Sequence, residues 1–472
     1  YNFSSNTRIS YAFSPKTSLT VTGRYYGQTQ DYSIDSSNGE STIDEWNVTA
    51  KLDADWKGVE LCGEVYISDY STFEFIDNAQ SERVYEARYD QRLFRPELRS
   101  VFNVNSNQEF IVGIGLNHEE LVRSSFWLDP SINTLYSYAQ YDASFFKEKI
   151  NFIVGARFDN HQEYKSQLSP KVAIQWNGSE KFNLKTSLAY GFKAPDFRQL
   201  YFDFSNSSVG YTVLGYNAVP ERLSELDNQG EIIEIIIPIS EYRGKLQAEN
   251  SLNFNFGLNY NPSKKLLLDA NFFYNRVKDL IDTRVIARKT NGQNVFSYHN
   301  IDEISTFGCE FNLKWIPSDN LRISSGYQLL YAYDRAAIDE FNSDNVFGRL
   351  APNQPVFRLE RSDYFGLLNR SRHMANIKIF ASIPRVNCDV NLRGTFRSKY
   401  GLFDSNNNNY LDDFDVFVDG YSIWDIALSK EVLGKFRVAL GMDNVFNFTD
   451  ADNISNIPGR SLYSKISFSF IS

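Results

Sequence analysis

The chain has 472 residues and a formal net charge of −10, and this acidic balance argues against nucleic acid as a partner. No apolar run approaches the roughly 18 residues that a membrane-spanning helix needs, although 15% of the residues are aromatic, with 29 Tyr and 38 Phe. The three cysteines, Cys62, Cys309 and Cys388, match neither a metal-site spacing nor a disulfide framework.

In chain order, about nineteen short segments alternate apolar with polar residues, from a first strand at residues 8–13 to a last at 461–470. The pattern is clearest over residues 251–277, where Phe254 and Phe256 share one parity and Asn253 and Asn255 the other. A period of two places the sets on opposite faces of a strand. Segments of about ten residues with an uncharged polar face predict an all-β fold, a transmembrane antiparallel β-barrel with lipid outside and a polar lumen.

Tight turns and long connections alternate between these segments. The tight turns, rich in Pro, Gly, Asn and Ser, are 14–17, 57–58, 104–107, 147–149, 177–181, 261–264, 317–320, 384–387 and 431–435. The long connections are 28–43, 71–93, 119–133, 160–167, 193–248, 279–305, 335–373, 399–419 and 445–460. Outer-membrane barrels have short periplasmic turns and longer external loops, so we expect the tight turns in the periplasm and the long connections outside.

The strand count indicates that this barrel is incomplete. The first and last of the nineteen segments both run toward the periplasm, whereas a closed antiparallel barrel needs an even number of strands. We therefore expect three further strands upstream, for a total of 22. Outer-membrane barrels of 22 strands are transporters whose lumen is plugged. Residues 1–472 are then a partial barrel, with the N-terminal plug and the first strands missing upstream.

Five motifs resemble segments of the TonB-dependent outer-membrane receptors. In chain order they resemble the family's GxRxD…sPr hairpin, GFRAP…EL segment, LkpExS strand start, xNLFN turn and terminal strand. They lie at residues 155–171, 190–201, 246–251, 443–447 and 458–470. Residues 1–150 match the family in strand rhythm alone.

This resemblance implies a receptor in the outer membrane of a Gram-negative bacterium, in contact with lipid and coupled to the TonB complex through the missing plug. It implies import of a bulky, scarce nutrient, for which we favour a ferric siderophore or another small-molecule metal chelate. Haem, cobalamin or a peptide or protein cargo remain alternatives, as does a surface lipoprotein as a further partner. A passive porin or an adhesin is the alternative outside this family. No arrangement of residues indicates an activated nucleophile, so we do not expect an enzyme.

The 193–248 connection is the first candidate for a ligand site. It concentrates aromatic and Arg side chains, which are typical of binding surfaces. The candidates are Phe197, Arg198, Tyr201, Tyr211, Tyr216, Arg222, Tyr242 and Arg243. A loop of this length also needs a core of its own, so self-packing is the alternative role for the aromatic rings.

Residues 404–415 are a candidate Ca²⁺ loop. Oxygen donors fall at positions 1, 3, 5, 7, 9 and 12 of an EF-hand-like spacing, with the seventh supplied by a backbone carbonyl. Asn409 replaces the usual glycine, so a solvated loop tip is the alternative. The donors are Asp404, Asn406, Asn408, Tyr410, Asp412 and Asp415. No cofactor beyond this structural Ca²⁺ is expected.

The chain has four histidines, which we place at outer strand ends or in external loops and which are the candidate haem ligands: His118, His161, His299 and His373.

Overall fold

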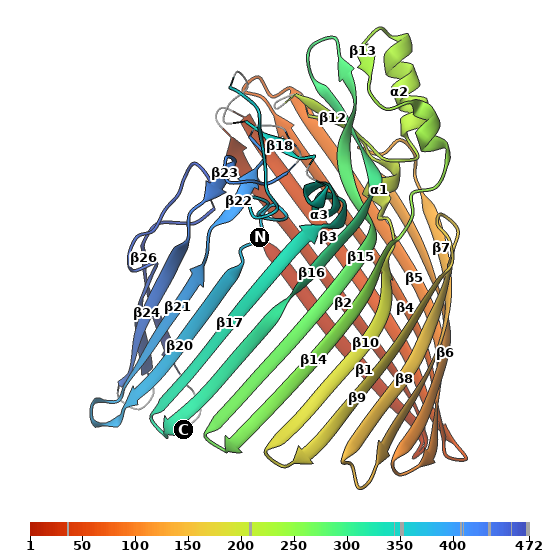
Figure 1. The fold of residues 1–472 in the computed structure, drawn as a ribbon. Coiled ribbons are helices and arrows are strands. Elements are labelled where there is room, and N and C mark those ends of the chain that lie inside the picture. The colour runs from red at the N-terminus through yellow and green to blue at the C-terminus, as the bar shows by residue number, and fades with distance from the viewer. Residues whose placement is uncertain are drawn as a thin grey trace.

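The computed structural model describes residues 1–34, 37–206, 210–343, 345–349, 354–405, 408, 410–432, 436–454 and 456–468. It confirms the predicted fold class, because long antiparallel strands curve into the wall of a barrel (Figure 1). The single large sheet has 22 strands within this part of the chain, of which β11, β12 and β13 belong to the 193–248 connection. The remaining nineteen form the wall, as the sequence predicts.

The wall strands follow one another around the barrel, each hydrogen-bonded to the next along the chain. They are β1 (Asn2–Ser14), β2 (Thr17–Ile34), β3 (Ser37–Trp56), β4 (Val59–Asp77), β5 (Arg83–Asn105), β6 (Gln108–Arg123), β7 (Ser131–Phe145), β8 (Ile150–His161), β9 (Gln167–Ser179), β10 (Phe182–Lys193), β14 (Glu249–Ser263), β15 (Leu266–Lys289), β16 (Asn294–Ser318), β17 (Leu321–Asp334), β20 (His373–Ile383), β21 (Cys388–Arg397), β24 (Tyr421–Val432), β25 (Phe436–Asp443) and β26 (Ser461–Phe468).

The two ends of this wall are not joined to each other. Within the described residues, β1 pairs with β2 alone and β26 with β25 alone. Both strands run from the end with the long connections toward the end with the tight turns (Figure 1). A direct β1–β26 pair would therefore be parallel. The expected total of 22 wall strands and the N-terminal plug stay predictions.

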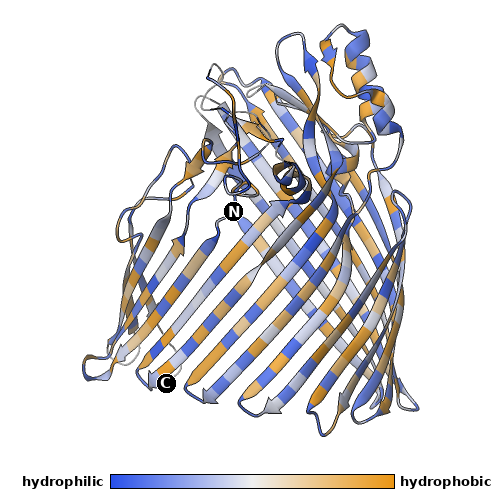
Figure 2. Cartoon of the chain, viewed as in Figure 1, coloured by the Kyte–Doolittle hydropathy of each residue, from blue (hydrophilic) through white to orange (hydrophobic). Residues whose placement is uncertain are grey.

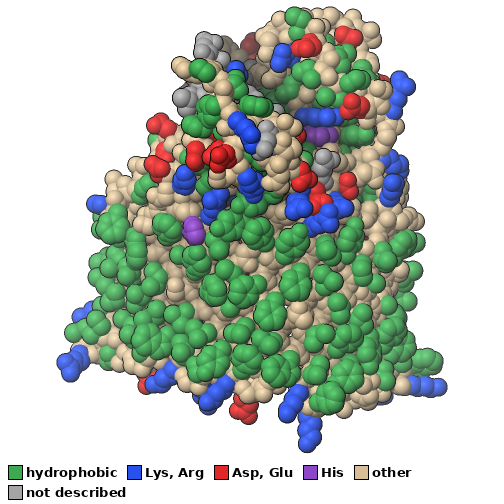
Figure 3. Space-filling view, in the orientation of Figure 1, with side chains coloured by type: hydrophobic (Ala, Val, Ile, Leu, Met, Phe, Trp, Pro, Cys, Tyr) green, Lys and Arg blue, Asp and Glu red, His purple; other side chains and the backbone are tan. Residues whose placement is uncertain are grey.

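The two parities of each strand lie on opposite faces of the wall, as predicted. In β14, Phe254 and Phe256 are 43% and 37% exposed, and their neighbours on β10 include Leu188, which is 44% exposed on the same face. Strand register also places four further apolar positions on this outer face: Ile377, Ile379, Val438 and Leu440. Figure 2 shows the alternation along each strand, and Figure 3 shows the resulting apolar band, with charged side chains above and below it. No helix within the described residues is long and apolar enough to cross a bilayer.

Short turns close the strands at the lower end of Figure 1. The turn between β3 and β4 has Lys57 and Gly58 at φ values of 53° and 83°. This pair of left-handed residues matches the twist of a two-residue hairpin. The turn between β20 and β21 contains the short helix η2 (Pro384–Val386) and ends at Asn387, with a φ of 49°.

Three of the expected long loops are instead extensions of the strands. β2 and β3 continue through residues 28–43, β4 and β5 leave just 78–82 unpaired in 71–93, and β15 and β16 continue through most of 279–305. Residues with high strand propensity and cross-strand polar bonds explain these hairpins. Tyr32, for example, donates a hydrogen bond of 2.6 Å to Glu74 across the sheet. The connections expected at these positions are therefore paired strands for most of their length.

The 193–248 connection folds into a compact unit, and we call its described residues from 194 to 248 the canopy. Its elements are α1 (Phe197–Tyr201), β11 (Asp203–Asn206), β12 (Tyr211–Leu214), α2 (Val219–Asn228), β13 (Ile232–Ile235) and η1 (Ile239–Arg243). β12 pairs in parallel with β16, and β13 pairs antiparallel with β15. Leu214, Val219 and Leu223 pack with Ile286 and Val295 of the extended hairpin in a core where each is fully buried. The canopy is thus joined to the β15–β16 hairpin.

A second small core organises the connections at 335–373 and 399–419. Its elements are α3 (Arg335–Asn342), β18 (Phe347–Gly348), β19 (Phe357–Arg358), β22 (Tyr400–Phe403) and β23 (Val416–Val418). Phe341, Val346, Leu359 and Tyr364 are buried together, and the Tyr410 ring packs edge-on against Phe341 at 5.2 Å.

The assignment of faces predicts the effect of charge on wall stability. We expect Phe254→Arg to lower the free energy of unfolding by about 2–4 kcal/mol, because the guanidinium would face hydrocarbon. Asn255→Arg should cost far less, since Asn255 lines a polar depression on the lumen side. Folding into liposomes under denaturant measures both. Equal destabilisation by the two substitutions would contradict the assignment.

Candidate functional site

A cavity of about 590 Å³ lies at the mouth of the lumen, where the outer ends of β5 to β8 meet the start of the canopy. The strands contribute inward-facing side chains, because alternate residues of each strand point to the lumen. These include Tyr89, Asn117, Glu119, Arg123, Thr134, Asp159 and His161. The segment at 192–198 contributes Phe192, Pro195, Asp196, Phe197 and Arg198.

Helix capping sets the position of the canopy residues in this cavity. Asp196 is the N-cap of α1, and its Oδ1 accepts a hydrogen bond of 2.7 Å from the backbone N–H of Gln199. The Gln199 side chain in turn accepts a bond of 3.0 Å from the Asp196 N–H, which completes a capping box. This geometry holds the first turn of the helix, with Phe197 and Arg198, at the edge of the cavity.

A second cavity of about 650 Å³ adjoins the first, and both are lined by Tyr89 and Arg123. It runs along the outer ends of β4 and β5 to the β11 strand of the canopy, where Asp203 and Phe204 line it. We call the two cavities together the mouth groove. The combined volume of the two cavities exceeds that of a pocket for one drug-sized molecule. The mouth groove therefore suits a bulky ligand.

Arg123 stands at the junction of the two cavities among aromatic rings. Its guanidinium carbon lies 5.7 Å from the centroid of Tyr89, 5.7 Å from Phe126 and 5.2 Å from Phe202. Within the described residues it has no carboxylate at ion-pair distance, and neither does Arg198. These two guanidinium groups therefore keep their full charge available to a ligand.

Of the groove carboxylates, Asp159 is neutralised, because Arg157 Nη2 lies 2.7 Å from its Oδ1. Beside the groove, Lys193 Nζ lies 2.8 Å from Glu249 Oε1. The Tyr164 ring stacks on His161 at a centroid distance of 3.9 Å, and burial raises the pKa of the Tyr164 hydroxyl.

Glu119 and Asp196 line the first cavity, and Glu74, Glu86 and Asp203 line the second. Asp203 and Glu86 have arginine partners outside the groove, Arg222 and Arg83. The groove thus combines two unpaired guanidinium groups with several carboxylates.

The canopy residues predicted as ligand contacts separate into two groups. Tyr201, Tyr216 and Tyr242 are 7%, 9% and 3% exposed and lie in the canopy core, which is the self-packing alternative. Arg222 forms an ion pair of 2.7 Å with Asp203 and a closer one with Glu225, so it stabilises the canopy.

The second group remains accessible. Phe197 and Arg198 line the mouth groove, and Arg243 is exposed outside it. Tyr211 packs edge-on against Phe204 and Phe296, at centroid distances of 6.4 Å and 6.3 Å. Of the eight residues, the structure thus brings Phe197 and Arg198 to the groove.

The groove residues on the strands were missed by the sequence reasoning. Tyr89, Arg123 and Tyr164 lie in stretches that the sequence assigns to strand ends and connections, far from the canopy in the chain. A usable signal was present, because Tyr89 and Arg123 have the inward parity of β5 and β6. The sequence alone does not show that the canopy folds back over β5 and β6 and so brings Arg198 to Tyr89 and Arg123.

The four histidines do not form a cluster. His161 alone lines the groove. His118 bonds to Asn133 and Glu120 on the outer face, His373 bonds to the Tyr327 hydroxyl at 2.8 Å, and burial lowers the pKa of His299 beside the canopy core. Within the described residues, no three His, Cys, Asp or Glu side chains gather closely enough to hold a metal ion.

The 404–415 loop uses its carboxylates for internal hydrogen bonds. Asp412 is fully buried and accepts bonds from the Phe414 N–H at 2.8 Å and from the Asn408 amide at 2.9 Å. Asp415 accepts from the backbone N–H groups of Ser405 and Asp412, at 2.9 Å and 2.8 Å. The Tyr410 hydroxyl bonds to Glu340. The candidate donor Asn406 lies outside the described residues, and Ca²⁺ binding stays a prediction.

Comparisons with known proteins agree with the architecture. A family model described as TonB dependent receptor-like, beta-barrel matches residues 1–445. The iron-regulated outer membrane virulence protein of Vibrio cholerae serotype O1 (strain O395) is 24% identical over 295 residues, which are 60% of this chain and 37% of that protein. The match to these curated relatives thus spans well under half of their length.

Several solved structures share the fold. The siderophore receptor PirA from Pseudomonas aeruginosa has a TM-score of 0.64 at 15% identity, covering 100% of this chain and 71% of that one. The FrpB iron transporter from Neisseria meningitidis has a TM-score of 0.66 at 15% identity, covering 99% and 71%. A mutant of the ferric enterobactin receptor PfeA from P. aeruginosa has 0.69 at 14%, covering 99% and 69%. At these identities the likeness shows the fold.

The acidic loop makes a testable prediction about Ca²⁺. We expect Ca²⁺ to bind with a measurable heat in isothermal titration calorimetry, and Asp404→Ala or Asp415→Ala to abolish it, because hard oxygen donors hold this ion. Burial raises the pKa of Asp415. Protons therefore compete for this carboxylate, and affinity should fall as the pH falls toward that pKa.

Asp413→Ala is the matched control for this titration. Asp413 is largely exposed and pairs with Lys399 at 3.6 Å, outside the predicted donor set. Its loss should leave the calcium heat unchanged. A parent protein that gives no calcium-dependent heat at neutral pH would remove the site.

Proposed function

We propose that the chain, which belongs to the TonB-dependent receptor-like β-barrel family, is the barrel of a Gram-negative outer-membrane receptor that imports a ferric siderophore or a similar metal chelate. The names of its relatives support this proposal, since they include an iron-regulated outer membrane protein and siderophore receptors. Lipid surrounds the apolar band, and the mouth groove faces the exterior. Coupling to TonB requires a plug, which we expect from sequence beyond residues 1–472 or from another chain.

The observation that carries the proposal is the charge of the mouth groove. Arg123 and Arg198 are two guanidinium groups without carboxylate partners in the described part of the chain, and they lie with Tyr89, Phe126 and Phe197. Aromatic faces stack on flat ligand rings, while Arg binds anionic oxygens with charge-assisted bonds. An iron chelate with aromatic, anionic arms satisfies both requirements.

The position of the groove suits the capture step of import. It opens at the outer end of the lumen, between the strand ends of the wall and the canopy, so a ligand bound there is already above the interior passage. The lumen wall below is lined by polar side chains such as Asn255, Asn271 and Lys185. In this proposal, withdrawal of the plug from the periplasmic side opens a hydrated path past these residues.

Haem is the second candidate ligand, because His161 lines the groove and stacks on Tyr164. A single imidazole with aromatic neighbours can supply one axial ligand. Cobalamin and peptide or protein cargo fit the same machinery, and a surface lipoprotein partner remains a proposal of the same kind. A passive porin or adhesin is disfavoured by the family, whose structural neighbours are named as receptors and transporters.

The groove charge predicts ligand selectivity. We expect a negatively charged ferric triscatecholate to bind the full-length protein, and Arg123→Ala with Arg198→Ala together to weaken that binding by roughly 100-fold, because a charge-assisted hydrogen bond contributes about 1.5–3 kcal/mol. A ferric trishydroxamate without net charge should bind weakly to both proteins. Quenching of intrinsic fluorescence measures each affinity.

Arg243→Gln serves as the control, since Arg243 is an exposed arginine of the same canopy outside the groove. Its affinity for the triscatecholate should equal that of the parent. If the double variant folds and binds the triscatecholate as the parent does, the ligand site lies elsewhere. Binding of haem that His161→Ala abolishes, without triscatecholate binding, would instead favour the haem receptor.

A further inference from the structure

The outer face of the wall carries charged side chains above the apolar band. Figure 3 shows Lys and Arg side chains, interspersed with Asp and Glu, at the upper edge of the band on the face drawn there. The wall beneath them includes Tyr327 of β17, which is 38% exposed and lies opposite Ala375 of β20 in the register.

An aromatic ladder continues the outer face of β16 and β17 beyond this point. Phe307 stacks on Tyr331 with a centroid distance of 5.3 Å, and Tyr331 stacks on Tyr333 at 6.0 Å. All three have the outward parity, since Phe307 and Tyr331 are register partners and Phe307 is 40% exposed. β20 begins at His373, and the chain just before it lies along the ladder, where the Leu330 N–H bonds to the Arg372 carbonyl at 2.9 Å.

Three cations lie over these rings, and we call them the cation cluster: Arg361, Arg372 and Lys399. Arg361 lies 4.6 Å from the Tyr333 centroid, and Arg372 lies 5.5 Å from Tyr331 and 4.2 Å from Phe365. Lys399 Nζ lies 5.6 Å from Phe365, so a single ring connects it to Arg372. The rings hold the cations at the boundary between the apolar band and water.

Little carboxylate neutralises this cluster. The guanidinium groups of Arg361 and Arg372 donate to backbone carbonyls, of Tyr364 at 3.5 Å and of Phe365 at 3.1 Å, and have no ion pair in the part of the chain that the structure describes. Lys399 pairs with Asp413 at 3.6 Å, but both side chains are more than half exposed, so this pair is weak. Of the nearby acids, Asp363 accepts a bond from the Glu360 N–H.

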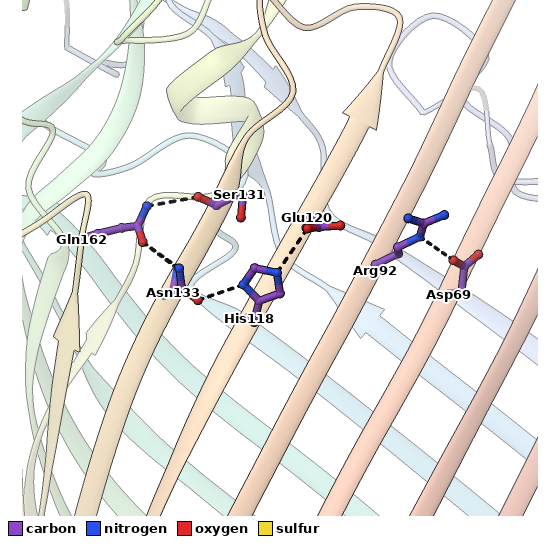
Figure 4. Close-up of polar contacts among 7 residues, drawn as sticks. All are labelled: Asp69, Arg92, His118, Glu120, Ser131, Asn133 and Gln162. Carbon is purple, nitrogen blue, oxygen red and sulfur yellow. Dashed lines mark hydrogen bonds and ion pairs between the residues drawn. The ribbon is translucent and has the colours of Figure 1, made fainter.

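On β4 to β7, outward-facing polar side chains are paired with one another (Figure 4). There Arg92 on β5 pairs with Asp69 on β4 at 2.9 Å, and His118 on β6 contacts Glu120 at 3.2 Å and Asn133 at 2.8 Å. These side chains have the outward parity too, because Arg92 is opposite Glu120 and Phe94 is opposite His118 in the register. In these strands the outward-facing arginine therefore already has a carboxylate partner.

We propose that the cation cluster binds the phosphate groups of lipid headgroups in the leaflet on the canopy side of the membrane. Its place directly above the apolar band puts it at headgroup level, where an anionic surface attracts basic side chains. Two planar guanidinium groups and one ammonium suit phosphate oxygens, and the aromatic ladder below them contacts acyl chains. The site is separate from the mouth groove and rests on the proposed membrane orientation alone.

Native mass spectrometry of the full-length protein in mixed micelles tests this site. Phosphatidic acid is the probe and phosphatidylcholine, whose phosphate is paired with choline, is the reference. We expect the parent to retain phosphatidic acid preferentially. The triple variant R361Q/R372Q/K399Q should lose that preference by tenfold or more, since each basic side chain near an anionic surface contributes on the order of fivefold. Electrophoretic mobility of the unheated protein verifies folding.

Arg92→Gln is the matched control, because it removes an outward-facing arginine that Asp69 already neutralises. It should leave lipid retention unchanged. Equal retention by the parent and the folded triple variant would overturn the proposal, as would equal loss in Arg92→Gln. Displacement of the lipid by millimolar inorganic phosphate would also overturn it in favour of a site for a free anion. Chelate binding by the triple variant should be normal, which separates this test from that of the import function.

Discussion

The constraint on which this structure depends is that backbone N–H and C=O groups cannot be left unpaired in hydrocarbon. Each wall strand hydrogen-bonds the backbone N–H and C=O groups of its neighbour in an antiparallel ladder, as between β15 and β16. Once the ladder is fixed, alternate side chains must face lipid and lumen, so Phe254 and Asn255 have opposite environments although they are adjacent. The apolar band and the polar lumen both follow from this pairing.

Pairing also decides where the ligand-facing chemistry can lie. Inside the band, the outward positions are committed to apolar side chains and the inward ones to a hydrated passage. Beyond the band both faces meet water, so side chains there are free to serve other roles. The mouth groove, the cation cluster and the canopy all lie in this outer region, and each uses the strand ends as a rigid base.

This division explains how much of the molecule could be predicted from its sequence. The wall was predictable, because a strand with lipid on one face and water on the other must alternate apolar and polar residues, as β14 does. The extended hairpins at 28–43, 71–93 and 279–305 were not, because strands with water on both faces lack that contrast and resemble loops. Tyr201, Tyr216 and Tyr242 resembled binding residues for a related reason: a small tertiary core and a ligand surface use the same aromatic types. The meeting of Arg123 with Arg198 depends on strand order, which one sequence does not encode locally.

The joining of the canopy to the β15–β16 hairpin has a consequence for the way ligands arrive. β12 and β13 are paired to the wall strands, and a shared core fills the space between them. The canopy is therefore held in a fixed position on the wall and does not act as a hinged lid. A ligand then meets a surface whose shape is set before the encounter, so little conformational entropy is lost on association. In the proposed receptor, discrimination among ligands would then rest on shape and charge at first contact and not on closure of the canopy.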